Sequence, residues 1–289
     1  MGDKERLNYL DGKTWSKYSI SVWDLVKTPS EARLGHPAMF PLELCERLIS
    51  IYTKVGDVVL DPFMGSGSVL VSAKKLGRKG IGFDIVPEFV ELARKRLENQ
   101  KIEIAFSTRI TEFLRDEEKV EEIRRRLKQV DITPEVYCAD ARTLLNYIKP
   151  CTVDLCITSP PYWKVHKRKR TADYKKPRPY SNLENDLGNI EDYKKFLGEL
   201  AKVFRNVQKV LKQGKRCIVV VMDIRVGGEF IPFHADVMEM MRKAGFTIED
   251  IIIWDRHREY NNLRPLGYPY TFIVNKVHEY ILIFRKSSI

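Results

Sequence analysis

A short run at residues 158–163, Thr-Ser-Pro-Pro-Tyr-Trp, carries the side chains of this chain that are best suited to chemistry. It follows an apolar stretch at residues 153–157, which has the length and composition of a buried strand. Two consecutive prolines cannot continue a β-ladder or a helix, so the strand has to stop here and hold a stiff loop at its carboxyl end. In an open α/β sheet, ligands bind at that end of the strands.

Three groups of this loop suit an exocyclic amine on a flat ring. The hydroxyl of Ser159 and the carbonyl of Pro160 can accept the two amine hydrogens, which leaves the nitrogen lone pair directed at an electrophile. Tyr162 offers an aromatic face on which the ring can stack. The same residues would also suit an ordinary Pro-Pro turn with a packed aromatic, and the loop alone leaves both readings open.

The loop resembles the Ser/Asp/Asn-Pro-Pro-Tyr signature of amino-methyltransferases, which methylate exocyclic nitrogens with S-adenosylmethionine. In that family the Ser form followed by an aromatic is similar to the cytosine-N4 branch. The Asp form is commoner among adenine-N6 enzymes, and the Asn form among enzymes that methylate glutamine in proteins. The resemblance implies a methyl-donor site elsewhere in the chain, and a catalytic role for Ser159, Pro160, Pro161 and Tyr162.

A second motif, Asp-Pro-Phe-Met-Gly-Ser-Gly at residues 61–67, turns from a short predicted strand into a helix predicted at residues 69–76. Glycines let the backbone approach a ligand closely, and the helix start presents free N–H groups and a partial positive charge. No Gly-Lys-Ser/Thr follows, so the motif is not a P-loop. It resembles the donor-binding motif of the same family. The resemblance assigns six residues to the cofactor: Asp61, Pro62, Phe63, Gly65, Ser66 and Gly67.

The next predicted strand, residues 80–84, ends in Asp84. In a doubly wound sheet, a carboxylate at this position can accept both ribose hydroxyls of a nucleoside cofactor. We therefore place Asp84 and its neighbour Ile85 at the donor site. The alternative is an acid at the start of the helix predicted at residues 88–98, where the helix dipole favours negative charge.

A third strand is predicted at residues 135–142, and it also ends in an acid, Asp140. In the resembled family a carboxylate here approaches the adenine amino group of the donor, so Asp140 and Ala141 join the cofactor site, as does Ser159. Asp140 would otherwise simply cap the helix that follows. We favour the ligand role because three strands would then deliver acids to one edge of the sheet.

The aromatic-proline step Phe40-Pro41 precedes a helix predicted at residues 42–53. In the resembled family such a step lines the methionine end of the donor, and we carry this role over to Phe40 and Pro41. A contact that only fixes the start of the helix fits these two residues equally well.

Eight Lys or Arg and one Asp lie between residues 164 and 178, directly after the catalytic loop. A run of charge is normally just solvated, but this position favours phosphate binding beside the target base. The expected nucleic-acid contacts are Trp163, Lys164, Lys167, Arg168, Lys169, Arg170, Lys175, Lys176 and Arg178.

The composition limits the function classes. The net charge of +11 favours a polyanionic partner. No stretch of 18 uninterrupted apolar residues and no signal-peptide core are present, so we expect a soluble, cytoplasmic protein without membrane contact. The five cysteines include no CxxC pair and the five histidines are scattered, which gives no metal site.

The elements predict an α/β fold, a doubly wound and mostly parallel seven-stranded sheet with helices on both faces and an antiparallel last strand. This is the class I methyltransferase arrangement, which is Rossmann-like. Residues 1–35 are expected to form an N-terminal arm that packs on the core, and residues 36–289 a single methyltransferase domain. Within it we expect a helical insertion at about 108–130, and basic substrate loops at about 164–189 and 256–275.

The function expected from these motifs is S-adenosylmethionine-dependent methylation of the N4 amine of cytosine in nucleic acid. The chain offers only two basic loops, the arm and a short insertion for target recognition, which favours structured RNA such as ribosomal RNA. A site-specific DNA methylase is the alternative. An adenine-N6 enzyme and an inactive nucleic-acid-binding module are less favoured, and the oligomeric state is left open.

Overall fold

A computed structural model describes residues 7–33, 39–103, 117–165, 181–260, 263 and 265–287. Its centre is one large sheet with the strand order β1-β9-β10-β6-β5-β2-β3-β4. In that order the strands are β1 (Val22–Asp24), β9 (Phe246–Asp255), β10 (His278–Lys286), β6 (Leu211–Val221), β5 (Val153–Thr158), β2 (Val58–Asp61), β3 (Lys79–Asp84) and β4 (Glu135–Cys138).

All neighbouring strands of this sheet pair in parallel except β10, which is antiparallel to both β6 and β9. The α/β class, the mostly parallel sheet and the antiparallel last strand are therefore confirmed. The predicted count of seven is wrong for the described residues, because β1 from the N-terminal arm adds an eighth strand beside β9. This short strand buries Trp23 and exposes Val22 and Asp24.

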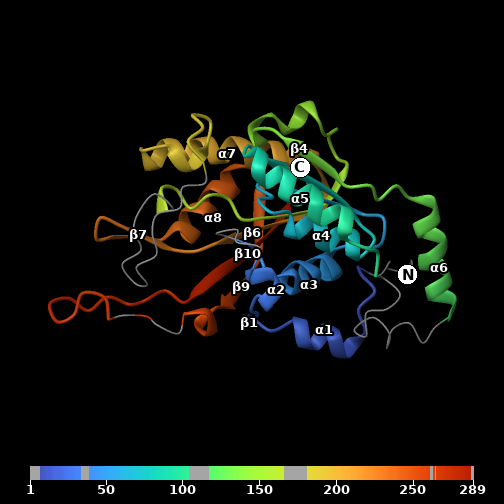
Figure 1. The fold of residues 1–289 in the computed structure, drawn as a ribbon, viewed down its shortest axis with the longest axis horizontal. Coiled ribbons are helices and arrows are strands. Elements are labelled where there is room, and N and C mark those ends of the chain that lie inside the picture. The colour runs from blue at the N-terminus through green and yellow to red at the C-terminus, as the bar shows by residue number, and fades with distance from the viewer. Residues whose placement is uncertain are drawn as a thin grey trace.

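Helices cover both faces of the sheet, as expected for a doubly wound fold. Figure 1 shows α3, α4 and α5 on one side of the strands and α7 and α8 on the other. The helices are α1 (Gly12–Tyr18), α2 (Pro29–Ala32), α3 (Leu42–Tyr52), α4 (Ser68–Lys75), α5 (Pro87–Asn99), α6 (Glu117–Gln129), α7 (Tyr193–Val210) and α8 (Phe233–Lys243). Short 3₁₀ turns occupy Ala141–Asn146, Leu187–Asn189 and His257–Glu259.

The two faces of the sheet bury two separate hydrophobic clusters. One joins α3, α4 and α5 to the strands through residues such as Leu48, Leu70 and Ala93. The other packs α7 and α8 on the opposite face through residues such as Phe204 and Met241. Every residue of the central strand β5 is buried, as expected for a parallel strand covered on both faces.

The N-terminal arm packs against the body of the molecule. The indole N–H of Trp254 in β9 donates to the carbonyl of Leu25 at 2.8 Å, and the guanidinium of Arg47 in α3 lies 4.7 Å from the centre of the Trp23 ring. Residues 7–33 of the arm thus pack on the core.

The one acid inside β5, Asp154, is buried and is paired with two cations. Lys212 and Lys215 both contact its carboxylate.

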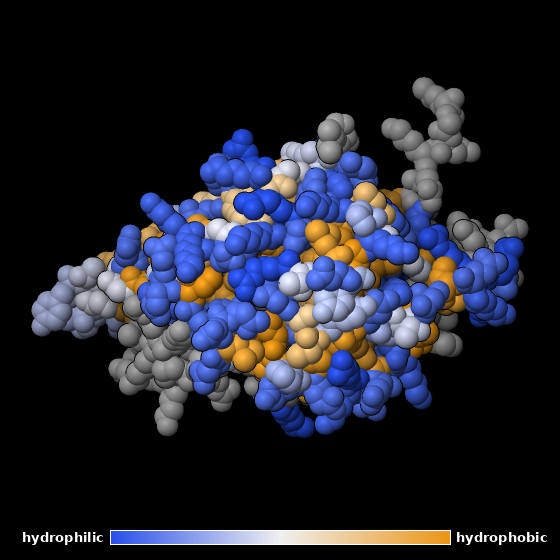
Figure 2. Space-filling model, turned by 90° about the horizontal axis from the view of Figure 1, so that it is seen from above, coloured by the Kyte–Doolittle hydropathy of each residue, from blue (hydrophilic) through white to orange (hydrophobic). Residues whose placement is uncertain are grey.

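The expected helical insertion contains α6, at the right of Figure 1, whereas residues 104–116 lie outside the described part of the chain. Ile123 of α6 is buried against Val55, and Arg126 pairs with Asp57. Figure 2 shows a mostly hydrophilic face with separate hydrophobic patches. No helix among the described residues is both long and apolar enough to cross a bilayer.

Candidate active site

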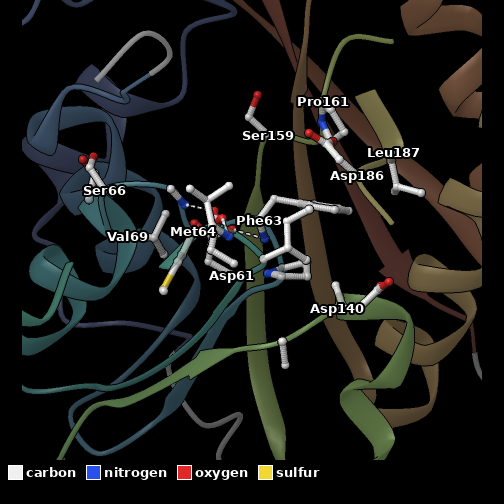
Figure 3. A pocket seen from close by; sticks show the side chains of 18 of the residues that line it. Asp61, Phe63, Met64, Ser66, Val69, Asp140, Ser159, Pro161, Asp186 and Leu187 are labelled. Carbon is white, nitrogen blue, oxygen red and sulfur yellow. Dashed lines mark hydrogen bonds between the residues drawn. The ribbon is translucent and has the colours of Figure 1, made fainter. Parts of the chain in front are cut away.

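One cavity lies at the carboxyl ends of β2, β3, β4 and β5, and it gathers residues from both sequence motifs (Figure 3). Twelve of the predicted site residues line it: Phe40, Asp61, Pro62, Phe63, Gly65, Ser66, Asp84, Ile85, Asp140, Ala141, Ser159 and Pro161. The lining also includes residues that the sequence did not single out: Met39, Met64, Ser68, Val69, Val86, Ala139, Asn185, Asp186 and Leu187.

Asp61, at the end of β2, is a buried carboxylate on the floor of this cavity. Its Oδ1 accepts hydrogen bonds from the Thr158 hydroxyl at 2.7 Å and the Phe63 N–H at 3.1 Å. Burial raises the pKa of Asp61 to about 7, and these two hydrogen bonds oppose the rise. Since both bonds go to Oδ1, Oδ2 remains able to accept from a ligand.

Asp84, at the end of β3, is held by backbone donors. Its Oδ1 accepts the Val86 N–H and its Oδ2 the Gly65 N–H, each at 2.9 Å. Burial raises the pKa of Asp84 to about 6, and the nearby charge of Asp186 adds to the rise. Each oxygen keeps a further lone pair, so this carboxylate can accept two hydroxyl groups from a ligand.

Gly67 serves packing rather than the cavity. It caps α4 with a left-handed φ of 77°, and it is absent from the cavity lining. A Cβ at this position would stand 2.8 Å from the Cβ of Ala93 in α5. Gly67 thus makes a close helix–helix contact and its predicted role at the donor stays a prediction, whereas Gly65 lines the cavity.

Asp140 caps the turn that follows it and also lines the cavity, so its predicted contact with the donor stays a prediction. It caps the 3₁₀ turn Ala141–Asn146 through the Arg142 N–H. The guanidinium of Arg142 pairs with Asp140 at 2.6 Å, with Glu199 of α7 at 2.6 Å and with the carbonyl of Asn185 at 3.1 Å. Strand β4 stops at Cys138, earlier than predicted, because this turn begins immediately afterwards.

Asn185, Asp186 and Leu187 form one wall of the cavity, and Figure 3 shows Asp186 and Leu187 on the other side of it from Ser66 and Val69. Asp186 is buried and accepts the Ser181 hydroxyl and the Gly188 N–H, each at 2.8 Å. The sequence does not predict this wall, because the three residues lie in a polar loop without periodicity. The one local feature that could have indicated it is an acid, Asp186, directly before Leu187 and Gly188.

The side chains of Ser159 and Tyr162, both predicted to be catalytic, are linked to each other. The Ser159 hydroxyl donates to the Tyr162 hydroxyl at 3.0 Å, and the Tyr162 hydroxyl donates to the Glu279 carboxylate at 2.7 Å. Glu279, at the start of β10, is buried and forms an ion pair with Arg256. Burial, together with the charge of Glu279, raises the pKa of Tyr162 well above its usual value, so the phenol stays protonated.

This arrangement determines what Ser159 can do. The single hydroxyl hydrogen of Ser159 is engaged by Tyr162, so its lone pairs are left to accept from the cavity. Pro160 is buried and Tyr162 half-buried, and neither is among the cavity-lining residues. The ring of Tyr162 meets Phe233 edge-on with centroids 6.1 Å apart.

Two residues expected to contact nucleic acid are engaged within the protein. Trp163 is buried, its indole donates to the carbonyl of Ile190 at 2.8 Å, and its ring packs against Tyr193. Its face is therefore closed to a base. Lys164 lies over the Trp163 ring and pairs with Glu191. The other seven, Lys167, Arg168, Lys169, Arg170, Lys175, Lys176 and Arg178, lie outside the described residues.

Of the two residues before α3, Phe40 lines the cavity, whereas Pro41 only caps the helix. Phe40 is buried, lines the cavity with Met39 and meets Trp254 edge-on. Pro41 caps α3, where its carbonyl accepts the Leu44 N–H, and it is not part of the lining.

The cavity fits a nucleoside donor that carries a cationic methionine group. Asp84 suits the ribose hydroxyls, the apolar side chains of Ile85 and Leu187 suit a flat base, and Oδ2 of Asp61 suits a cation. A doubly wound sheet with such a site at its switch region and Ser-Pro-Pro-Tyr at the next strand end defines a class I amino-methyltransferase.

The comparison with family models agrees with this class. The chain belongs to the N6/N4 amino-methyltransferase family: the family model described as DNA methylase matches residues 1–95 and 153–289.

Among similar curated proteins, Type II methyltransferase M2.DpnII of Streptococcus pneumoniae is 54% identical over 84 residues, which are 28% of this chain and 31% of that protein. Type II methyltransferase M.HpaI of Haemophilus parainfluenzae is 42% identical over 82 residues, 28% of this chain and 26% of that protein. The match thus spans about a third or less of these relatives. Among solved structures, a putative DNA modification methylase of Thermus thermophilus, TTHA0409, is 34% identical over 52% of this chain and 51% of its own, with a TM-score of 0.37.

Proposed function

We propose that this methyltransferase transfers a methyl group to the exocyclic N4 of cytosine in DNA. One observation carries the proposal: Ser159 lines the same cavity as Asp61 and Asp84, so the amine acceptor and the donor carboxylates face one space. The Ser form of the signature supports cytosine over adenine.

The donor supplies an electrophilic methyl group on a sulfonium. The residues of the chain bind and orient: Ser159 accepts one hydrogen of the cytosine amine, and the carbonyl of Pro160 is proposed to accept the other. The ring of Tyr162, a half-buried residue, is proposed to stack on the extruded base. The N–C bond forms as the S–C bond breaks, and the amine then releases a proton.

We favour DNA over RNA as the substrate because of the proteins to which this chain is similar. The relatives reported above are named Type II methyltransferases or a DNA modification methylase, and the family model is described as DNA methylase. The expectation of structured RNA rested on the small recognition regions, and those remain the one observation in its favour.

We also propose that residues 36–289 act as one methyltransferase domain. Strand β1 of the N-terminal arm adds the edge strand to the sheet of this domain.

The test uses methyl-labelled S-adenosylmethionine with genomic DNA, ribosomal RNA or assembled ribosomal subunits, followed by digestion to nucleosides. Label in N4-methyldeoxycytidine supports the proposal. Label in N4-methylcytidine from RNA alone overturns the choice of DNA, and label in N6-methyldeoxyadenosine overturns the choice of base.

Two variants separate the proposed roles. Ser159→Ala should lose turnover and keep donor affinity, because its hydroxyl meets the amine. Asp84→Ala should lose donor affinity, measured by calorimetry, because its oxygens hold the ribose. The reverse pattern would show that these two roles are assigned wrongly.

A further inference from the structure

The segment at residues 265–275, here called the aromatic tip, exposes three large rings to solvent. Tyr268 is 78% exposed, Tyr270 93% and Phe272 95%. Rings that are this exposed gain nothing from packing in the folded chain, and an exposed apolar cluster marks an interaction site.

The tip is nevertheless built around an ordered turn. Leu266 and Ile273 form an antiparallel bridge, and the N–H groups of Tyr270 and Thr271 donate to the Gly267 carbonyl at 2.8 and 2.7 Å. Gly267 is required there, since a Cβ would stand 2.1 Å from the Thr271 carbonyl oxygen. The rings are thus presented on a defined support.

The base of the tip is anchored behind the catalytic loop. The Arg256 N–H donates to the Val277 carbonyl at 2.8 Å, which joins the two ends of the connection between β9 and β10. Arg256 pairs with Glu279, and Glu279 accepts from the Tyr162 hydroxyl at 2.7 Å. The two ends of the tip are therefore connected to Arg256 and Glu279, and Glu279 accepts the hydrogen bond from Tyr162.

A second hairpin, β7 (Ile224–Val226) and β8 (Glu229–Ile231), contacts the tip's own connection. The ammonium of Lys276 lies 5.0 Å from the centre of the Phe230 ring, and the guanidinium of Arg225, in the same β7–β8 hairpin as Phe230, lies 5.7 Å from it. Since β5, β6 and β9 run parallel, the catalytic loop, this hairpin and the tip all leave the same edge of the sheet. Figure 1 shows both hairpins projecting to the left of the body.

The charge of the segment around the tip favours an anionic partner. Residues 260–277 contain Arg264 and Lys276 and no Asp or Glu, in a chain of net charge +11. Aromatic rings flanked by cations and free of acids suit a polyanion that offers flat faces, as nucleic acid with unstacked bases does. A second copy of this basic chain would bring like charge to the same surface.

We propose that the aromatic tip is a base-stacking element that contacts nucleic acid beside the target nucleotide, where extrusion of a base leaves its neighbours without a stacking partner. The inference rests on the proposed function, because only an enzyme that withdraws a base creates such a gap. The contact is sequence-tolerant, since every base has a face on which a ring can stack.

The experiment measures binding of the full chain to a labelled DNA duplex and to the same single strand at several salt concentrations. The variant Tyr270→Ala/Phe272→Ala should bind single strands about a hundredfold more weakly, roughly tenfold for each ring removed. Tyr270→Phe/Phe272→Tyr keeps both rings and should bind like the wild type. Thr271→Ala is the matched control within the tip.

Salt separates stacking from charge. The double alanine variant should leave the slope of log affinity against log salt unchanged, whereas Lys276→Ala should reduce that slope. Donor affinity and melting temperature should stay at wild-type values in the double variant, because the rings are exposed.

Unchanged nucleic-acid affinity in the double alanine variant would overturn the proposal. So would a shift in oligomeric state by light scattering with unchanged nucleic-acid affinity, since the tip would then join two copies of the chain. These failures are distinct from failure of the proposed function, in which the wild type would yield no N4-methyldeoxycytidine at all.

Discussion

The hydroxyl of Thr158, the last residue of β5, donates to the buried carboxylate of Asp61, the last residue of β2, at 2.7 Å. This bond ties the strand that carries the catalytic loop to the strand that carries the donor motif. It also opposes the rise that burial causes in the pKa of Asp61, which stands at about 7.

The first prediction concerns pH. The folded pKa values of about 7 for Asp61 and about 6 for Asp84 lie above the ordinary value of 3.8. Between about pH 4 and these values the folded protein holds protons that the unfolded chain has released, so this contribution to stability is lost as the pH rises through 6 to 7. We expect the free energy of unfolding of the donor-free protein to fall by up to about 1.4 kcal/mol per pH unit for each group.

Donor affinity should change in the opposite direction over the same range, because the ionised carboxylates bind the donor. Urea unfolding and calorimetry from about pH 5 to pH 8 measure the two trends. Asp61→Asn is the control, and it should flatten the part of both trends that Asp61 contributes. A variant with the full wild-type pH dependence would contradict this assignment.

The second prediction concerns Glu279 as a positioning residue for Ser159. Tyr162→Phe removes the hydroxyl that joins Ser159 to Glu279, and misorientation of the serine should lower kcat about tenfold to a hundredfold. Glu279→Gln should lower kcat less, because its amide oxygen can still accept from Tyr162. Donor affinity should be unchanged in both variants.

Glu279→Ala tests the same network through stability. It would remove one of the two carboxylates that pair with the largely buried guanidinium of Arg256 and leave only Glu259, which should cost about 1–3 kcal/mol. Denaturant unfolding measures the loss, and Glu279→Gln should recover part of it. A kcat equal to that of the wild type in Tyr162→Phe would remove the positioning role from this network.

The sequence predicted the parts of the fold that have strong local signals. The apolar run that ends at two prolines marks β5, and acids at strand ends mark the cavity edge that Asp61 and Asp84 form. Strand β1 was missed because it has three residues in a polar arm, and its partner Ile253 lies far along the chain. A pairing of this kind depends on the assembled sheet rather than on local propensity.

The candidate site shows the same division. Trp163 follows the catalytic tyrosine and resembles a binding aromatic in sequence, but the direction of its side chain depends on the loop, which turns it towards Tyr193. Asp186 and Leu187 reach the cavity only because the loop that carries them folds back to Arg142. These placements depend on contacts between distant segments, which a local pattern does not encode.

The third prediction concerns Arg142, which holds Asp140, Glu199 and the carbonyl of Asn185 at once. Arg142→Lys keeps the charge but cannot reach three partners with a planar fork. The cavity wall at Asn185 should loosen, and we expect donor affinity to fall about tenfold, the loss that one charge-assisted hydrogen bond typically causes.

Arg94→Lys is the matched control, because Arg94 also donates to a backbone carbonyl, that of Val136 in β4, and Val136 does not line the cavity. Calorimetry with the donor compares the two variants with the wild type. Equal donor affinity in Arg142→Lys and Arg94→Lys would mean that Arg142 contributes to folding alone.

The last prediction tests what Gly67 is for. Gly67→Ala would place a Cβ 2.8 Å from the Cβ of Ala93 and force a φ of 77° on a residue with a side chain. The two effects should destabilise the fold by about 2–4 kcal/mol in urea unfolding. Ala93→Gly alone should cost about 1 kcal/mol in its helix. Gly67→Ala/Ala93→Gly should lose less stability than the sum of the two single variants, because removing one Cβ makes room for the other.

The donor affinity of Gly67→Ala, measured well below its melting temperature, should stay close to the wild-type value, since Gly67 does not line the cavity. Additive losses would contradict the contact between positions 67 and 93, and a loss of donor affinity as large as that of Asp84→Ala would support the predicted role of Gly67 at the donor.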